Sequence, residues 1–264
     1  MDLGIQGRRA LLLASSGGLG YASAQSLARE GVRVCISGSD LGRAEDAARR
    51  IADETGSPVT GLCGNLSDPA NMDTLLRDAE AALGGPVDIL FVNHGGPPLR
   101  TALEISQEDL GTYANTMVLS PVRMIQLTVA GMIARTWGRV IMVGAAAVTE
   151  PAPNNVLSNM YRAGLAHYCK TLAGEVIRDG VTVNVVSPTA VLTERTRGTA
   201  AVRGARKGLT AEEELARREQ ASLAGRFGAP EDFGALVAFL AGGNAGYMTG
   251  ANWRVDGGSA GGLG

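Results

Sequence analysis

Short apolar runs alternate with helical stretches along the whole chain, and this alternation constrains the fold more than any other feature. The runs that predict strands are 8–15, 32–38, 58–65, 87–95, 138–145, 181–188 and 252–258. They are apolar at nearly every position, as are strands of a parallel sheet that is covered on both faces. The stretches between them, such as 21–31 and 41–56, have helical periodicity and end near a glycine. The pattern therefore predicts an α/β protein with a doubly wound parallel sheet.

The chain is predicted to form one domain over residues 1–264. Its 264 residues, 45% of them hydrophobic, are enough for a sizeable core, and no internal repeat divides them. The connection at 189–225 is long for a compact domain, and such connections are usually functional or contain helices. Within it, Thr210 is a predicted N-cap for the acidic stretch that follows. We interpret 189–225 as a lid over a substrate pocket, with a solvated insertion as the alternative.

Charge and cysteine content predict the setting in which the protein works. The formal net charge of −2 and the isoelectric point near 5.8 give no sign of a nucleic-acid partner. Cys35, Cys63 and Cys169 form no disulfide or metal-ligand pattern, so they are interpreted as reduced core residues. The first residues lack the apolar length of a secretory signal, and no apolar run is long enough to cross a bilayer. The sequence predicts a cytoplasmic protein without a membrane, nucleic-acid or metal partner.

A glycine-rich turn, residues 13–20, follows the first predicted strand. Gly18 and Gly20 allow a tight turn and a close approach of the backbone to a pyrophosphate. The helix that is expected to begin near Leu19 then presents unpaired N–H groups to the phosphates. A strand, this turn and a helix together predict a dinucleotide-binding (Rossmann) sheet.

Four segments give the chain a resemblance to the short-chain dehydrogenases/reductases. The family's T-G-x-x-x-G-x-G turn matches residues 13–20, and its N-N-A-G motif matches "VNHG" at 92–95. The segment 184–193 resembles the N-x-x-x-P-G segment that closes over the nicotinamide, and 225–258 resembles the family's C-terminal pattern. The resemblance covers nearly the whole chain and implies that a single domain binds NAD(P).

The resemblance also implies which residues hold the cofactor. These are Ala14, Ser16, Gly17, Gly18, Leu19, Gly20, Ser39, Arg43, Asn65, Leu66, Asn93, Gly95, Arg162, Pro188, Ala190, Val191 and Thr193. No acid stands near the end of the second strand, where it would favour NAD, because Asp40 comes too late. Ser39 stands where NADP-preferring relatives often have an arginine. Small residues leave room for a phosphate that Arg43 can reach from the next helix. NADPH is therefore the predicted cofactor, with NADH as the alternative.

Carbonyl reduction in this family uses an Asn-Ser-Tyr-Lys tetrad, and all four of its positions have changed in this chain. The resemblance places Met117, Ala145, Ser158 and Arg162 at these positions. Asn115 is two residues from Met117, which turns its side chain roughly 200° away on a helix. Ser158 and Arg162 are the residues that the resemblance leaves at catalytic positions.

Two neighbours of these positions are further candidates. Tyr161 lies about 100° round the helix from Arg162 and is interpreted as a packing residue or, with Ala145 and Ser158, as a wall of the substrate pocket. His94 stands at a strand end, where it contacts a ribose or substrate, or else is a structural histidine.

Reduction of a ketone needs a hydride and a proton, and none of these positions holds an ordinary acid. A guanidinium such as that of Arg162 has a pKa above about 12, and an unactivated serine such as Ser158 is a poor acid. A phenol with a pKa near 10 beside the ketone would donate the proton from the substrate itself. In lacking all four tetrad residues, the chain resembles the atypical ketoreductases of actinomycete aromatic-polyketide pathways. That resemblance implies NADPH-dependent reduction of a polycyclic, angucyclinone-like ketone.

Two other functions stay open on the same fold. One is a non-redox lyase, cyclase or isomerase, which would convert its substrate without consuming NADPH. The other is a non-catalytic NAD(P)-binding module. For the assembly, the family resemblance implies a homo-oligomer, commonly a tetramer, formed by the helices at 115–135 and 158–178 and by the C-terminal segment 256–264.

Overall fold

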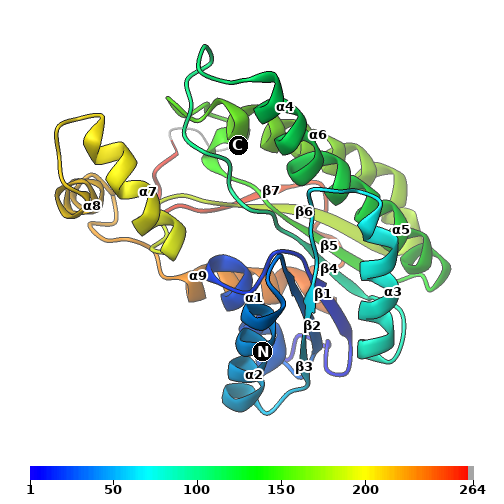
Figure 1. Ribbon diagram of the computed structural model, residues 1–264. Helices are drawn as coiled ribbons and strands as arrows, with labels where there is room; N and C mark the ends of the chain where they lie inside the picture. The colour runs from blue at the N-terminus through cyan, green and yellow to red at the C-terminus, as the bar shows by residue number, and fades with distance from the viewer. Residues whose placement is uncertain (261–264) are drawn as a thin grey trace.

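The protein is built around one parallel sheet. The structure, a computed structural model, describes residues 1–260, so 261–264, the end of the predicted domain and of the C-terminal segment, lie outside the described residues. Within that range the sheet has seven parallel strands in the order β3-β2-β1-β4-β5-β6-β7 (Figure 1). The strands are β1 (Arg9–Leu12), β2 (Arg33–Gly38), β3 (Val59–Cys63), β4 (Ile89–Val92), β5 (Gly138–Val143), β6 (Val181–Pro188) and β7 (Asn252–Val255). The order extends from β1 in both directions, so the predicted doubly wound sheet is confirmed.

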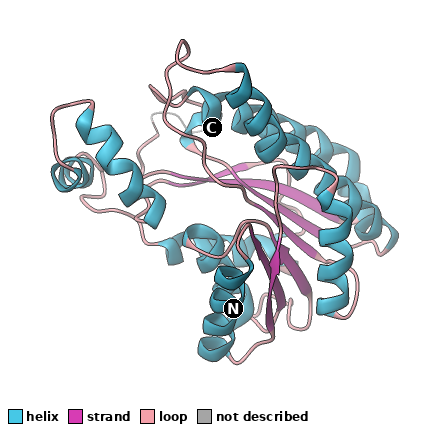
Figure 2. Ribbon diagram, viewed as in Figure 1, coloured by secondary structure: helices cyan, strands magenta, loops and turns pink. Residues whose placement is uncertain are grey.

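Helices cover both faces of this sheet (Figure 2). One layer, which shares a core cluster with one face, consists of α1 (Gly18–Arg29), α2 (Leu41–Thr55) and α9 (Pro230–Ala241). The other layer consists of α3 (Asn71–Leu83), α5 (Ser120–Ala134) and α6 (Val156–Val176). The remaining helices are α4 (Gln107–Ala114), α7 (Glu194–Ala205) and α8 (Ala211–Gln220), with short turns η1 (Asn115–Leu119), η2 (Ala146–Val148), η3 (Ile177–Asp179) and η4 (Gly243–Ala245).

The two layers explain why the strands are apolar at successive positions. In β1, Leu11 packs into the cluster on one face, while Ala10 and Leu12 pack into the cluster on the other. Phe91 in β4 meets Phe233 in α9 edge to face, with ring centroids 6.4 Å apart. Both faces of the strands are therefore buried, and the loops that follow them are left to form a site.

One long helix bears on the expectation that no apolar run is long enough to cross a bilayer. In the described part of the chain, α4, η1 and α5 form a continuous helix, Gln107–Ala134, with a mean hydropathy of 1.5 in its most apolar window. By length and composition alone it could cross a membrane. Met124, Ile125 and Met132 nevertheless bury one side of it in the core. Polar residues such as Arg123 interrupt this helix, so it contains no uninterrupted apolar run of that length.

The segment 189–225 contains two helices, α7 and α8, that pack against each other at one end of the sheet (Figure 1). The second begins as predicted, because Thr210 Oγ1 accepts a hydrogen bond from the backbone N of Glu213 at 3.1 Å. The first was not predicted, since two glycines weaken its helical pattern. Thr193 caps it in the same way.

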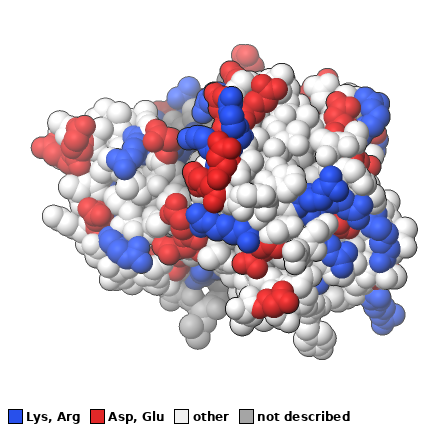
Figure 3. Space-filling view, turned by 90° about the horizontal axis from the view of Figure 1, so that it is seen from below, with Lys and Arg blue, Asp and Glu red and all other residues white. Residues whose placement is uncertain are grey.

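One of the three cysteines predicted to lie in the core is exposed. Cys35 and Cys169 are buried and free, as predicted. Cys63 is also free but exposed, because it ends β3, the edge strand of the sheet. Elsewhere, acidic and basic side chains are interspersed over the face seen in Figure 3, in keeping with a formal net charge of −2.

The glycine turn after β1 is packed too tightly to accept a side chain at Gly20. A Cβ added there would lie 2.6 Å from Cα of Ser15, whereas one added at Gly17, which is extended (φ −165°), would meet nothing within 4 Å. We expect Gly20→Ala to lower the free energy of unfolding by about 1–3 kcal/mol through overpacking. The matched variant Gly17→Ala should change it by less than about 0.5 kcal/mol. Denaturant unfolding of both variants measures this, and equal losses would contradict the packing described here.

Candidate active site

The loops that follow β1, β4, β5 and β6 border one cavity of about 540 Å³. Parallel strands place their carboxyl ends at the same edge of the sheet, which is where doubly wound folds bind ligands. Most of the site residues predicted from the sequence meet in its wall. These are Ala14, Ser16, Gly17, Gly18, Leu19, Arg43, Asn93, Gly95, Ala145, Ser158, Arg162, Pro188, Ala190, Val191 and Thr193.

The other predicted residues do not line this cavity. They are Gly20, Leu66 and Met117, which are buried, Ser39 and Asn65, which are exposed, and Tyr161. The hydroxyl of Tyr161 donates a hydrogen bond to the carbonyl oxygen of Leu110 in α4, at 2.8 Å. Of the two roles that the sequence left open for Tyr161, packing residue and pocket wall, the structure shows the packing role, and Tyr161 does not line this cavity.

The turn between β1 and α1 fits the phosphates of a dinucleotide. Gly17 is the N-cap of α1 and no side chain caps this helix, so its first N–H groups have no side-chain partner. Gly18 and Ala14 have positive φ angles, of 56° and 48°, and turn the chain sharply. Asn93 Nδ2 donates a hydrogen bond to Ala14 O at 2.9 Å, which ties the end of β4 to the turn. The backbone donors are therefore held in place beside the cavity.

Arg43 is placed to meet a phosphate near the adenosine end of a cofactor. It lines both the main cavity and a neighbouring hollow that also touches Ser16, Gly17 and Arg50. Within the described part of the chain, the Arg43 guanidinium forms no ion pair or hydrogen bond, whereas Arg50 stacks on a tyrosine ring. Its charge is consequently available to a ligand.

Arg162 is anchored at the end of β5. Its Nη1 donates hydrogen bonds to the carbonyl oxygens of Val143, at 2.6 Å, and Gly144, at 2.8 Å. Burial, with a smaller effect from Arg195, lowers the pKa of Arg162 to about 10. An ordinary guanidinium has a pKa above about 12, so burial makes Arg162 a stronger acid than the sequence alone predicts. Arg162 is still a cation at neutral pH.

The other positions that the resemblance assigns to the tetrad hold Ser158, Ala145 and Met117. Ser158 is buried and lines the cavity beside Ala145, and its hydroxyl makes no hydrogen bond to the described residues. Met117 is fully buried in the π-helical turn η1. Asn115 Nδ2 donates to Ser67 O at 3.1 Å, so this amide is directed to another part of the molecule, as the helical spacing predicted.

His94 was left open by the sequence, and the structure makes it part of the cavity wall. It is 4% exposed, and its Nδ1 lies 3.0 Å from the carbonyl oxygen of Gly95. Because a carbonyl only accepts, Nδ1 carries the proton and Nε2 is a bare acceptor. Nε2 is buried and has no partner among the described residues. Burial, followed by Arg162, lowers the pKa of His94 to about 3, so the ring is neutral.

Sequence reasoning missed three arginines in the wall: Arg195 and Arg203 of α7 and Arg218 of α8. A signal was present, since Arg195, Thr199 and Arg203 are spaced four residues apart and all line the cavity. It was overlooked because this helix was not predicted. The lid segment is thus the most basic part of the wall.

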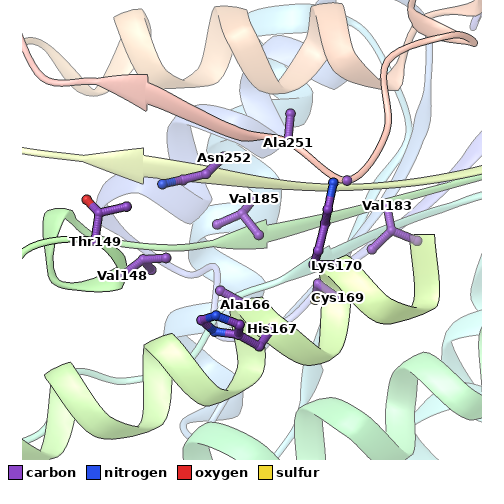
Figure 4. A pocket seen from close by; sticks show the side chains of 11 residues that line it. Val148, Thr149, Ala166, His167, Cys169, Lys170, Val183, Val185, Ala251 and Asn252 are labelled. Atoms are coloured by element: carbon purple, nitrogen blue, oxygen red, sulfur yellow. The ribbon is translucent and has the colours of Figure 1, made fainter. Parts of the chain in front are cut away.

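A second, smaller cavity of about 250 Å³ lies between α6 and the strands β6 and β7 (Figure 4). Figure 4 shows His167 and Lys170 on α6, with Ala251 and Asn252 across the gap. None of the predicted site residues lines it. The site that the motifs describe is therefore the larger cavity.

Comparisons with known proteins agree with this site. A family model described as "Enoyl-(Acyl carrier protein) reductase" matches residues 13–260. The chain belongs to the short-chain dehydrogenase/reductase family. A 3-oxoacyl-[acyl-carrier-protein] reductase, FabG of Escherichia coli, is 31% identical over 256 residues, which are 97% of this chain and 98% of the relative. The chain is thus a member of an oxidoreductase family along its whole length.

Solved structures show the same fold with a cofactor. L-sorbose reductase from Gluconobacter frateurii, complexed with NADPH and L-sorbose, is 30% identical, covers 100% of both chains and has a TM-score of 0.92. A single-residue variant of actinorhodin polyketide ketoreductase with NADPH has a TM-score of 0.90, over 95% of this chain and 96% of its own. At 24% identity, this second likeness shows the fold alone. The prediction of a nicotinamide cofactor is confirmed at the level of the family.

The buried neutral His94 makes stability depend on pH. An unfolded histidine has a pKa near 6.5, so acid protonates the unfolded chain first and stability is lost as pH falls from about 6.5 towards about 3. When the pH is lowered from 7 to 5, this histidine should reduce the free energy of unfolding by about 2 kcal/mol. We expect His94→Ala to remove that part of the acid sensitivity, measured by denaturant unfolding at both pH values. His167→Ala is the matched control, since His167 is exposed, and an unchanged slope in His94→Ala would contradict this account.

Proposed function

We propose that this chain is an NADPH-dependent ketoreductase that reduces a ketone of an aromatic polyketide, angucyclinone-like in type, with the proton supplied by a neighbouring phenol of the substrate. The observation that carries the proposal is the composition of the cavity wall. Among the described residues that line it, none is a tyrosine, lysine or cysteine. His94 is neutral there because its pKa is lowered to about 3. The carboxylic acid in the wall, Glu194, also borders the hollow beside Arg43, on the cofactor side. The wall thus favours hydride transfer without a protein acid at the ketone.

The cofactor is proposed to lie along the glycine turn and the ends of the strands. The N–H groups at the start of α1 bind its phosphates, and Arg43 binds the phosphate that distinguishes NADPH from NADH. Thr193 and Arg162 hold the end that reacts. When bound, the reduced nicotinamide supplies the hydride. The similar proteins FabG and L-sorbose reductase are both reductases, which supports reduction of the ketone as the direction of the reaction.

Arg162 supplies fixed positive charge where the ketone is reduced. Two backbone carbonyls hold its Nη1, so the charge does not have to be reorganised during the reaction. It stabilises the negative charge that develops on the ketone oxygen, while its other N–H groups remain available to a ribose hydroxyl. With a pKa lowered to about 10, it is also a rival proton donor, which the substrate pair below distinguishes.

The substrate's own phenol is proposed to finish the reduction. Ala145 and Ser158 are small, so a polycyclic ring system fits beside Arg162 in a cavity of about 540 Å³. A phenol adjacent to the ketone forms an internal hydrogen bond to it and delivers its proton at high effective concentration. The enzyme then contributes binding, orientation and charge.

The lid, the assembly and the location are part of the same proposal. Residues 189–225 act as a lid, because α7 and α8 contribute to the cavity wall. Exposed Leu119 and Met160, 49% and 44% accessible, lie on the helices proposed to form a homotetramer. The free cysteines fit the proposed reducing, cytoplasmic location.

The test compares two ketones that differ only in the proposed proton donor. Chrysophanol, an anthraquinone with phenols beside a carbonyl, should be reduced with consumption of NADPH. Its dimethyl ether, in which both phenols are blocked, should react at least about 100-fold more slowly, the usual contribution of a general acid. Loss of NADPH absorbance and product analysis measure both rates. Equal rates for the two ketones would contradict a substrate-supplied proton.

Two variants test what Ser158 and Arg162 contribute to the reaction. Ser158→Ala should keep kcat within about threefold, because the serine is not the acid, whereas loss of an acid would cost about 100-fold or more. Arg162→Gln should lower kcat/KM for chrysophanol by about 10- to 100-fold through loss of charge stabilisation. Conversion of a substrate without consumption of NADPH would instead favour the non-redox function.

A further inference from the structure

Two sets of basic residues in the segment 189–225 differ in their partners. Lys207 Nζ and Arg217 Nε pair with the buried carboxylate of Glu214, at 2.9 and 3.0 Å. Three arginines that line the main cavity form no ion pair among the described residues. The second set therefore brings positive charge to the cavity wall without forming an ion pair. We call its members the lid arginines: Arg195, Arg203 and Arg218.

The lid arginines are held close enough to repel one another. Arg195 Nη2 is tied to the carbonyl oxygen of Pro97, and Arg218 lies over the ring of Phe227, 5.7 Å from its centroid. Burial and then Arg203 lower the pKa of Arg218. Burial also lowers the pKa of Arg195, where Arg203 adds to the effect and a nearby tyrosine opposes it. Arg195 and Arg218 are anchored, and each is repelled by Arg203. Three cations in this arrangement suit an empty cavity poorly and suit the binding of an anion well.

Arg203 gives an independent sign of a missing partner. Its Nε is buried and has no hydrogen-bond partner in the described part of the chain, although buried N–H groups in proteins are almost always paired. A bound anion that reaches this N–H would satisfy it. The nearby carboxylates do not do so: both oxygens of Glu214 are used by Lys207 and Arg217. Glu194 lines the cavity but also borders the hollow beside Arg43, on the cofactor side.

We propose that the lid arginines form a subsite for an anionic group of the substrate, a carboxylate or an ionised acidic hydroxyl, in the cavity that also holds the reacting ketone. The proposal rests on the proposed function, because it assumes that this cavity binds the substrate. It adds that the substrate carries a negative charge away from the ketone. A planar guanidinium forms two parallel hydrogen bonds to a carboxylate, which makes arginine well suited to this task.

The other source of negative charge is the cofactor. Its phosphates are already provided for by the N–H groups at the start of α1 and by Arg43, which the sequence motifs place beside them. The lid arginines follow Thr193 in the chain, and Arg195 is tied to the loop after β4 instead of to the glycine turn. A direct measurement of cofactor affinity nevertheless belongs in the test.

The test uses two ring systems that differ by one charge. Rhein is a dihydroxyanthraquinone carboxylate, and chrysophanol has a methyl group in place of the carboxylate. Binding of each to the protein saturated with NADP⁺ is measured by isothermal titration calorimetry, so no turnover is required. We expect rhein to bind about tenfold more tightly than chrysophanol to the natural protein. Arg203→Gln should reduce this preference to within about twofold, and Arg195→Gln and Arg218→Gln provide independent variants if that one does not fold.

The control is Arg197→Gln, because Arg197 lies on the same helix, is exposed and does not line the cavity. It should keep the full preference for rhein, and all variants should bind NADP⁺ within about twofold of the natural protein. Equal binding of rhein and chrysophanol by the natural protein would overturn the subsite. So would weaker NADP⁺ binding in the lid variants without loss of the preference, which would assign these arginines to the cofactor. Failure to reduce chrysophanol would sink the proposed function but leave this binding difference to be measured.

Discussion

The contact on which the site depends is that of Arg162 with two backbone carbonyls at the end of β5. A guanidinium in a partly dry environment is costly unless its N–H groups are satisfied, and the oxygens of Val143 and Gly144 satisfy one end of it. These partners are neutral, so the positive charge is not cancelled as it would be by a carboxylate. Together with burial it keeps His94 neutral, and it leaves an uncompensated charge next to the cavity. In the proposed reaction, this charge stabilises the alkoxide that develops on the ketone oxygen.

The sheet explains why these groups meet at all. Parallel strands β1, β4, β5 and β6 end at one edge, so Ala14, Asn93 and Pro188, far apart in the chain, contribute to one cavity. Asn93 then joins two of these loops by its hydrogen bond to Ala14. Positive φ angles at Ala14 and at Ala190 show that the backbone around the cavity is held in an unfavourable conformation. Rigidity of this kind suits a site that orients a substrate whose own group completes the reaction.

Local patterns allowed the sequence to predict much of this arrangement. Buried strands are recognisable as apolar runs, and the glycine turn and the end of β4 are motifs of a few residues, so their place in the cavity followed. Properties set by tertiary packing were out of reach. Helical spacing gave the direction of Asn115 correctly, but it could not show that Tyr161 binds to α4. The exposure of Cys63 depends on which strand lies at the edge of the sheet, and the unpaired Nε2 of His94 depends on every described neighbour of that ring.

In the segment 189–225, local sequence patterns predicted one helix and failed to predict the other. Its second helix was predicted from its cap, whereas its first helix, and with it the face that carries Arg195 and Arg203, was hidden by glycines. Two distant segments thus determine the electrostatics of the cavity: α6 provides Arg162 beside Ser158, and α7 and α8 provide Arg195, Arg203 and Arg218. Together they describe a site rich in fixed cations and poor in mobile protons.

The central claim, that the reduction takes its proton from the substrate, is tested most directly by varying the acidity of that proton. The measurement is the single-turnover rate of NADPH oxidation for a series of ketones whose adjacent phenol carries electron-withdrawing or electron-donating substituents, compared with the rates of the same ketones with borohydride. After correction for the intrinsic reactivity of each carbonyl, the rate should rise as the pKa of the phenol falls, until the phenol is ionised before it reacts. A rate that is independent of phenol acidity would contradict the account and assign the proton to the protein.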